Sequence, residues 1–248
     1  MFSNEKRCIY DANCLADVIC QLRFPEILTI ETNLPAQFQD AIRDQFPKYN
    51  LRRENTAPGK PENQQVNNYQ FTSEDGVWRV NLTSKFISLA CTKYTCWEDF
   101  ASKLDRPLAA FIQLYKPAYF ERIGLRYLNF ISREALGLAD VPFRELIEPC
   151  YLGILSEEDI SEANTSRVSL DCELAIRGGC RARIHAGPGK TGRNGKLEDE
   201  VKFIFDQDLY VPGKVAVNLS AGALQTLHSQ AWSIFRGAIT DRLHKAME

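Results

Sequence analysis

Five charged residues lie in apolar segments whose alternation predicts β-strands. Asp206 and Asp208 are two positions apart, so they share one face of a strand. Arg122 and Arg126 share a face of a second strand in the same way, and Arg23 lies between Leu and Phe in a third. Charges among large apolar residues are usually paired when they are buried. These residues therefore predict either an Arg/Asp network that joins three strands or a polar pocket in which the arginines receive an anionic or peptide ligand.

A second charge pattern marks a predicted β-hairpin that turns at Gly178-Gly179. A three-residue loop there places Glu173 opposite Arg183 and Asp171 opposite His185, all on one face of the sheet. This pattern is typical of a solvated face with cross-strand ion pairs, each of which contributes less than about 1 kcal/mol. We add Arg183 to the candidate ligand- or partner-binding residues.

The residue types needed for catalysis do not assemble into a recognisable constellation. His185 has an acid opposite it but no adjacent nucleophile, His228 falls on the buried side of the last predicted helix, and His244 lies near the end of the chain. Asp206 and Asp208 form the one pair that suits general acid–base work, although two carboxylates in a strand also serve structure. We predict no catalytic residue and favour a protein without enzymatic activity, which leaves enzyme action by the Asp pair as a third hypothesis.

The glycine-rich stretch from His185 to Lys196 contains Gly189-Lys190-Thr191, the second half of a phosphate-binding loop. The first glycine of that motif falls at Ile184, and the stretch leads into another predicted strand instead of a helix. We therefore expect a hairpin loop, with a basic loop that touches a partner or an anion as the alternative.

Composition excludes several classes of function. Among the 248 residues, 44% are apolar and 25% are charged, and the formal net charge is -2. The isoelectric point near 6.0 and the scattered basic residues make a nucleic-acid role the last choice. The eight cysteines form no C-x-x-C pair and only three histidines accompany them, so we expect no metal, no cofactor and free, mostly buried thiols. The chain shows no signal peptide and no apolar run of membrane-spanning length, which predicts a cytoplasmic protein.

The order of the predicted elements is β-α-β-β-β-α-β followed by β-β-β-α. Hairpins dominate this order, which favours an α+β fold with a mainly antiparallel sheet of about seven strands. We expect the helices, including a long C-terminal helix, to pack on one face of that sheet. The polar segment from Leu51 to Gln65 is expected to be a loop. A single α+β domain over residues 1–248 is the preferred organisation, and two lobes over residues 1–140 and 165–248 are the alternative.

Five stretches, in this order and spacing, resemble a sporadically distributed, uncharacterised prokaryotic family of proteins of about this length. They are Val18-Ile-Cys-Gln-Leu-Arg-Phe-Pro25, Leu34-Pro-Ala-Gln-Phe-Gln39, Tyr94-Thr-Cys-Trp-Glu-Asp-Phe100, Glu121-Arg-Ile-Gly-Leu-Arg-Tyr-Leu-Asn129 and Phe205-Asp-Gln-Asp208. The resemblance covers nearly the whole chain and brings no catalytic residue with it. It implies a free-standing bacterial or archaeal protein, and the patchy occurrence of the family suits accessory genes in defence or toxin–antitoxin loci.

The first functional hypothesis is a non-catalytic accessory protein that binds a protein partner, in the manner of an antitoxin, immunity or chaperone-like factor. The second is a sensor of a small anionic or nucleotide-like ligand, with a pocket between the sheet and the C-terminal helix. The sequence leaves homo-oligomerisation open and predicts no membrane contact.

Overall fold

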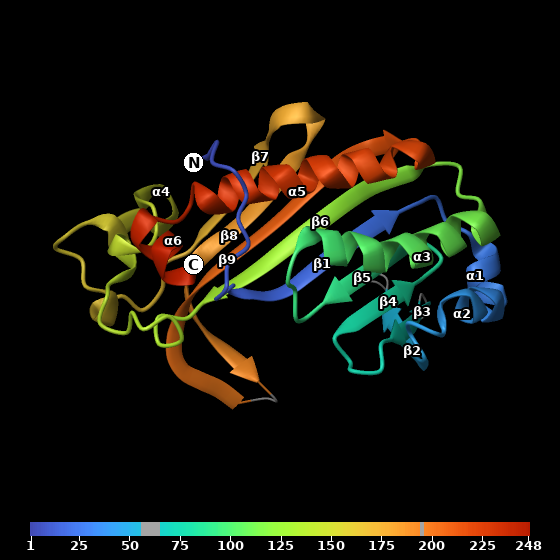
Figure 1. Ribbon diagram of the computed structural model, residues 1–248, viewed down its shortest axis with the longest axis horizontal. Helices are drawn as coiled ribbons and strands as arrows, with labels where there is room; N and C mark the ends of the chain where they lie inside the picture. Colours follow the sequence, from blue (N-terminus) through green and yellow to red (C-terminus); the bar gives the residue numbers. More distant parts are fainter. Residues whose placement is uncertain (56–64, 194–195) are drawn as a thin grey trace. The chain divides into compact units, whose positions relative to one another are not determined.

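The computed structural model describes residues 1–55, 65–193 and 196–248. It is α+β, and the described strands form one antiparallel sheet in the order β2-β3-β4-β5-β1-β6-β9-β8-β7 (Figure 1). The strands are β1 (Leu15–Arg23), β2 (Lys48–Asn55), β3 (Gln65–Thr72), β4 (Trp78–Leu82), β5 (Phe86–Cys91), β6 (Phe120–Ile131), β7 (Leu170–Ala175), β8 (Arg181–Arg193) and β9 (Lys196–Val215). The α-helices are α1 (Leu28–Thr32), α2 (Ala36–Ile42), α3 (Trp97–Tyr115), α4 (Pro149–Leu152), α5 (Ser220–Arg236) and α6 (Asp241–Met247).

The α+β class and the antiparallel sheet are confirmed, but the prediction of about seven strands is wrong because the described sheet has nine. One added strand is β2, which takes in residues 51–55 of the segment that was expected to be a loop. It pairs with β3 from Lys48 opposite Thr72 to Asn55 opposite Gln65. A terminal strand with charged residues on both faces lacks the apolar alternation by which strands are recognised. The rest of the expected loop, residues 56–64, lies outside the described residues.

The chain divides into two units that alternate along the sequence. Unit 1 consists of Met1–Ala16, Arg126–Leu209 and Gln225–Glu248, and unit 2 of Asp17–Leu125 and Tyr210–Leu224. This division neither confirms nor contradicts the predicted single domain or its two-lobe alternative, so both remain predictions.

In unit 2, helix α3 packs its apolar side against the sheet. Phe100 and Phe111 are fully buried. The ring of Phe111 lies 4.6 Å from that of Phe24 at the end of β1, and the ring of Phe100 lies 5.8 Å from that of Trp78 in β4. Apolar residues at three- and four-residue spacing in this helix therefore form its buried side.

A row of neutral polar side chains crosses five strands of unit 2. Strand register aligns Asn50, Gln70, Asn81, Ser88 and Gln21 in β2, β3, β4, β5 and β1. Gln70 Nε2 donates to Asn81 Oδ1 at 3.2 Å, and Asn81 Nδ2 donates to Ser88 Oγ at 3.0 Å. These three residues are buried. Because buried polar groups are costly when they lack partners, mutual hydrogen bonding is what allows a polar row at this depth.

In unit 1, α5 lies against one face of the sheet (Figure 1). His228 of this helix shares a 2.8 Å hydrogen bond between its Nδ1 and the hydroxyl of Tyr127 in β6. The ring of Phe235 lies 6.0 Å from that of Phe205 in β9. Since successive strand residues point to opposite faces, this packing directs the residues next to Tyr127 and Phe205 to the other face.

The remaining structural expectations concern the membrane and the thiols. None of the described helices is long and apolar enough to cross a membrane. The eight cysteines are free, as predicted, but the expectation that most are buried is wrong. Three are buried, four are half-buried and Cys150 is exposed.

Replacing Asn81 by Ala is expected to lower the free energy of unfolding by about 1–3 kcal/mol, because it removes two hydrogen bonds at the centre of the buried row. The matched control is Arg79→Ala, an exposed residue on the same face of β4, which should change stability by less than about 0.5 kcal/mol. Urea unfolding followed by circular dichroism measures both. Equal stability of the two variants would contradict the structural role of the row.

Thiol reactivity should follow burial. Burial raises the pKa of Cys91 to about 11 and that of Cys14 to about 12. At pH 8, below both values, these thiols stay protonated and therefore unreactive. Iodoacetamide at pH 8 should alkylate the exposed Cys150 well before Cys91 or Cys14, and all should react in denaturant. Peptide mass spectrometry reads the order, and equal rates in the folded protein would contradict it.

Candidate functional site

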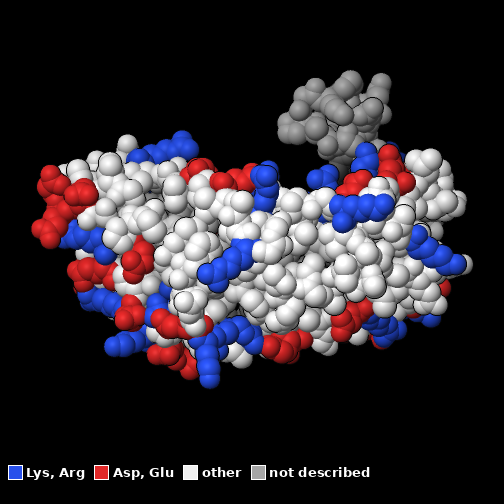
Figure 2. Space-filling view, turned by 90° about the horizontal axis from the view of Figure 1, so that it is seen from above, with Lys and Arg blue, Asp and Glu red and all other residues white. Residues whose placement is uncertain are grey.

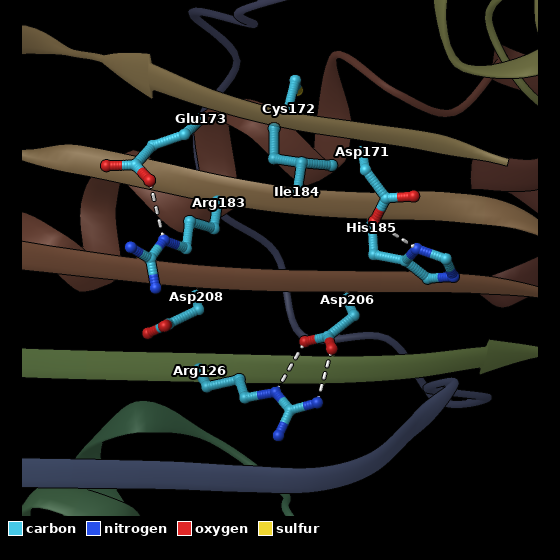
Figure 3. A pocket seen from close by; sticks show the side chains of 9 residues that line it. All are labelled: Arg126, Asp171, Cys172, Glu173, Arg183, Ile184, His185, Asp206 and Asp208. Atoms are coloured by element: carbon cyan, nitrogen blue, oxygen red, sulfur yellow. Dashed lines mark hydrogen bonds and ion pairs between the residues drawn. The ribbon is translucent and has the colours of Figure 1, made fainter. Parts of the chain in front are cut away.

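Unit 1 has a charged groove on the sheet face opposite α5. The groove has a volume of about 480 Å³ and draws its residues from four strands, β6, β9, β8 and β7 (Figure 3). Its lining consists of Arg126, Asp171, Cys172, Glu173, Arg183, Ile184, His185, Asp206 and Asp208. We call this set the charged groove.

The hairpin of β7 and β8 supplies one side of the charged groove. The predicted register is confirmed, with Asp171 opposite His185 and Glu173 opposite Arg183. His185 Nδ1 lies 2.7 Å from Asp171 Oδ1, and Arg183 Nε donates to Glu173 Oε2 at 2.8 Å. Arg181 Nη1 also donates to Glu173, at 3.1 Å. The alternation that buries Ile184 on the other face therefore forces these pairs outward.

Strands β6 and β9 supply the other side. Arg126 binds Asp206 with two parallel bonds, from Nε to Oδ1 at 2.7 Å and from Nη2 to Oδ2 at 2.5 Å. The side chain of Arg126 is 43% exposed and that of Asp206 is 19% exposed. This is the bidentate geometry in which guanidinium and carboxylate bind most specifically. Asp208 lies on the same face, between Arg126 and Arg183 in Figure 3.

The six candidate binding residues are divided between the two units. Four of them, Arg126, Arg183, Asp206 and Asp208, line the charged groove. The other two, Arg23 and Arg122, belong to unit 2.

The side chain of Arg122, in unit 2, lies over an aromatic ring. Its guanidinium lies 4.4 Å from the centre of the Tyr210 ring, a cation–π distance. A Cβ added at Gly124 would fall 2.2 Å from Arg122 Nη1. The flexible end of the Arg122 side chain therefore lies across Gly124 and takes the space that a Cβ at this position would fill.

Asp171, Glu173 and His185 line the charged groove. For these three residues the sequence predicts only a solvated face with ion pairs. The hairpin register placed them correctly relative to one another. What it could not show is that β6 pairs with β9, which brings Arg126 beside Asp206 and so opposite the hairpin. Strands β7 and β8 lie between β6 and β9 in the sequence, so strand order does not predict that β6 and β9 are neighbours.

The chemistry of the charged groove is that of ion pairs. Its lining carries four carboxylates against two guanidiniums, and Arg181 outside the lining binds one of these carboxylates, that of Glu173. Carboxylates therefore remain in excess. It contains no hydroxyl nucleophile, and Cys172 points to the opposite face by strand alternation. Among the described residues of the groove, no three potential metal-ligand atoms lie within 4.8 Å of one another. This arrangement suits recognition of a basic partner better than bond cleavage.

A second cavity, of about 490 Å³, takes in part of the glycine-rich stretch. Its lining includes Pro188, Gly189 and Lys190 together with Arg133 and Arg167. No helix follows the Gly-Lys-Thr run, as expected for a stretch that is not a phosphate-binding loop, since β8 continues to Arg193. The expectation of a hairpin loop from the stretch as a whole is wrong because most of it is strand, and residues 194–195 lie outside the described part. We call this space the basic cavity.

The surface charges of the described residues are mixed. On the side seen in Figure 2, Lys and Arg lie interspersed with Asp and Glu and form no broad single-sign area among the described residues. Comparison with family models and with curated proteins finds no match to the chain. The resemblance to a sporadically distributed prokaryotic family therefore remains a prediction.

The stability of the Asp206→Asn variant distinguishes two interpretations of the Arg126–Asp206 pair, a buried structural network and an open site. Because Arg126 is nearly half exposed, solvent screens the pair, and we expect the free energy of unfolding to fall by only about 1 kcal/mol or less at low salt. The loss should shrink as NaCl approaches 1 M. Asp171→Asn, at a residue whose side chain is 71% exposed, is the matched control and should cost less.

Guanidinium unfolding is unsuitable for this comparison because it adds salt, so urea is used. A loss of about 3–5 kcal/mol for Asp206→Asn, independent of salt, would mean that the pair is a buried structural network and not an open site.

Proposed function

We propose that the protein is a non-catalytic accessory factor that binds a second protein through the charged groove. The observation that carries this proposal is the acidic excess of the groove on an uncovered sheet face. A positively charged segment of a partner gains from that excess, and exposed Lys or Arg side chains supply such a segment. Paired charges of both signs also fix the position of the partner on the groove, because a partner that binds in another position meets like charges.

The acidic excess argues against a small anion in the charged groove. Both arginines there already bind carboxylates of the same chain, Arg126 with Asp206 and Arg183 with Glu173. An anionic ligand would have to displace a carboxylate from each guanidinium and then lie among the remaining acids. A basic partner displaces no carboxylate from the arginines, and the remaining acids attract it.

The same bonds argue against Asp206 as a catalytic acid or base. Each of its two oxygens accepts an N–H of Arg126. Each oxygen therefore keeps only one further lone pair for a substrate proton, in a direction that the bidentate guanidinium fixes. Enzymatic action by the Asp pair therefore ranks below binding.

An antitoxin, immunity or chaperone-like role in a prokaryotic defence or toxin–antitoxin locus is the biological setting that we propose, in the cytoplasm. The support is the resemblance of the five sequence stretches, together with a groove lined by ion pairs. Such factors act by occupying a partner, so they need complementarity and no reactive group.

Site-specific photo-crosslinking in the native cells tests the proposal. The variant Arg181→p-benzoylphenylalanine places the crosslinker beside the charged groove while Arg183 continues to pair with Glu173. We expect one protein partner to be captured in stoichiometric yield through a peptide rich in Lys or Arg. The control, Ser102→p-benzoylphenylalanine on the exposed side of α3, should capture no such partner.

Neutralising the groove supplies the second control. Asp171→Asn combined with Glu173→Gln should reduce capture at position 181 at least tenfold, because it removes two of the four carboxylates. Capture that is equal at positions 102 and 181, or unchanged after neutralisation, would overturn the proposal.

A small-anion sensor is the second candidate, and the basic cavity is what favours it. Arg133, Arg167 and Lys190 line that cavity against one acid, Glu162. Glu162 is bound to Arg133. The cavity lining contains no further carboxylate for Arg167 and Lys190. No residue of α5 lines the four cavities described, so the predicted position between sheet and C-terminal helix remains a prediction.

Calorimetric titration with inorganic phosphate and with ATP tests the sensor. Binding at micromolar to millimolar concentration that Arg167→Ala combined with Lys190→Ala weakens at least tenfold would support it. The variant Arg144→Ala, an exposed arginine outside the cavity lining, is the control. No heat from either anion would remove this candidate.

A further inference from the structure

Three potential metal ligands from opposite ends of the chain meet in unit 1. They are the thiol of Cys8, the imidazole of His244 in α6 and the carboxylate of Glu248. Their ligand atoms all lie within 4.8 Å of one another. Cys8 and His244 are half-buried, and Glu248 is exposed to solvent. This cluster is separate from both the charged groove and the basic cavity.

The spacing of these atoms suits zinc. His244 Nε2 and Glu248 Oε1 are 3.5 Å apart. Two ligands on a tetrahedral zinc, with bonds of about 2.0–2.2 Å, lie about 3.3–3.5 Å from each other. Residues four apart on a helix share a face. Glu248 caps α6, and its backbone N–H donates to His244 O, which holds the two side chains on one side. The sulfur needs a move of about 1 Å or less to reach its longer bond of about 2.3 Å.

Tyr10 orients the other two ligands. Its hydroxyl lies 2.8 Å from His244 Nδ1 and also hydrogen-bonds the side chain of Cys8. When Nδ1–H donates to the Tyr10 oxygen and the Tyr10 O–H donates to the sulfur, Nε2 keeps its lone pair for a metal. A hydrogen bond that fixes the tautomer of the ligating histidine is the usual outer support of a zinc site. Tyr10 is 8% exposed, so this support is shielded from water.

The donor set selects the metal. A thiolate disfavours Mg²⁺ and Ca²⁺, which take oxygen ligands, whereas sulfur, imidazole and carboxylate are all ordinary zinc ligands. One thiolate and one carboxylate neutralise a divalent ion. The nearby guanidinium of Arg236 is paired with Glu5 and Asp241, which reduces its repulsion of a cation.

We infer that Cys8, His244 and Glu248 form a zinc site that ties the N-terminal segment to the last helix. On binding, the thiol proton leaves, and sulfur, Nε2 and a carboxylate oxygen occupy three positions while water takes the fourth. The segment already lies along α5 and α6, through Ser3 N donating to Ser233 O at 2.9 Å and Ala12 N donating to Met247 O at 3.0 Å. A metal between these two contacts closes the segment onto the helices. The C-x-x-C rule could not reveal this site because its ligands are distant in sequence.

Cobalt substitution of the full chain tests the site directly. Metal-free protein titrated with Co²⁺ should bind one equivalent and develop tetrahedral visible bands together with a near-ultraviolet thiolate-to-cobalt band. Zn²⁺ should displace the colour. Colour without the thiolate band, or six-coordinate pale cobalt, would overturn the assignment, as would a failure to bind either metal.

Variants and thiol protection identify the ligands. Cys8→Ser and His244→Gln should each weaken Zn²⁺ binding at least tenfold, whereas Cys150→Ser, at an exposed thiol outside the cluster, should leave it unchanged. In the unmodified protein, Zn²⁺ should slow iodoacetamide labelling of Cys8 at least tenfold and leave Cys150 unaffected. Protection of Cys8 does not depend on the folding of any variant. Labelling of Cys8 that is unchanged by Zn²⁺ would contradict the proposal.

Discussion

The packing of α5 on one face of β6 and β9, with α4 against β8, is the constraint on which the charged groove depends. Tyr127, Phe205 and Ile184 must face the helix side to be buried. Since strand side chains alternate, each of these residues fixes the direction of its neighbours. This alternation holds Arg126, Asp206 and Arg183 on the uncovered face. Burial of their apolar neighbours therefore determines where these charged side chains lie.

The charges then constrain one another. Arg126 and Asp206 satisfy each other in a bidentate pair, and Glu173 accepts from both Arg181 and Arg183. Exposed pairs of this kind contribute little to folding, so their number on one face is poorly explained by stability. An acidic excess that stability does not require is better explained by recognition of a basic partner. Such recognition depends on the sum of the charges in the groove and not on any single residue.

Local elements of this fold could be predicted from the sequence. The hairpin register followed from one short turn and strict alternation. Strand β2 was missed because an edge strand rich in charge leaves no pattern. The glycine-rich stretch was read as a loop because glycine favours turns, yet a Cβ at Gly187 would lie 2.5 Å from Val168 O. Here glycine permits close backbone approach inside a strand, which a sequence alone cannot distinguish from a turn.

The candidate sites depended on contacts between distant segments. The pairing of β6 with β9 and the approach of Cys8 to His244 are tertiary facts with no local signature. Arg23 and Arg122 belong to unit 2, and the network predicted to join them to the Asp pair stays a prediction.

Hydroxyl-radical footprinting tests most directly whether the uncovered face of unit 1 is occupied by a partner. The chain is oxidised in extract of its native cells and again after purification, and peptides are compared by mass spectrometry. The account predicts that His185 is oxidised several-fold less in the extract, while Leu34, an exposed residue of unit 2, is oxidised equally in both. Equal oxidation of His185 in extract and in the purified protein would contradict the central claim.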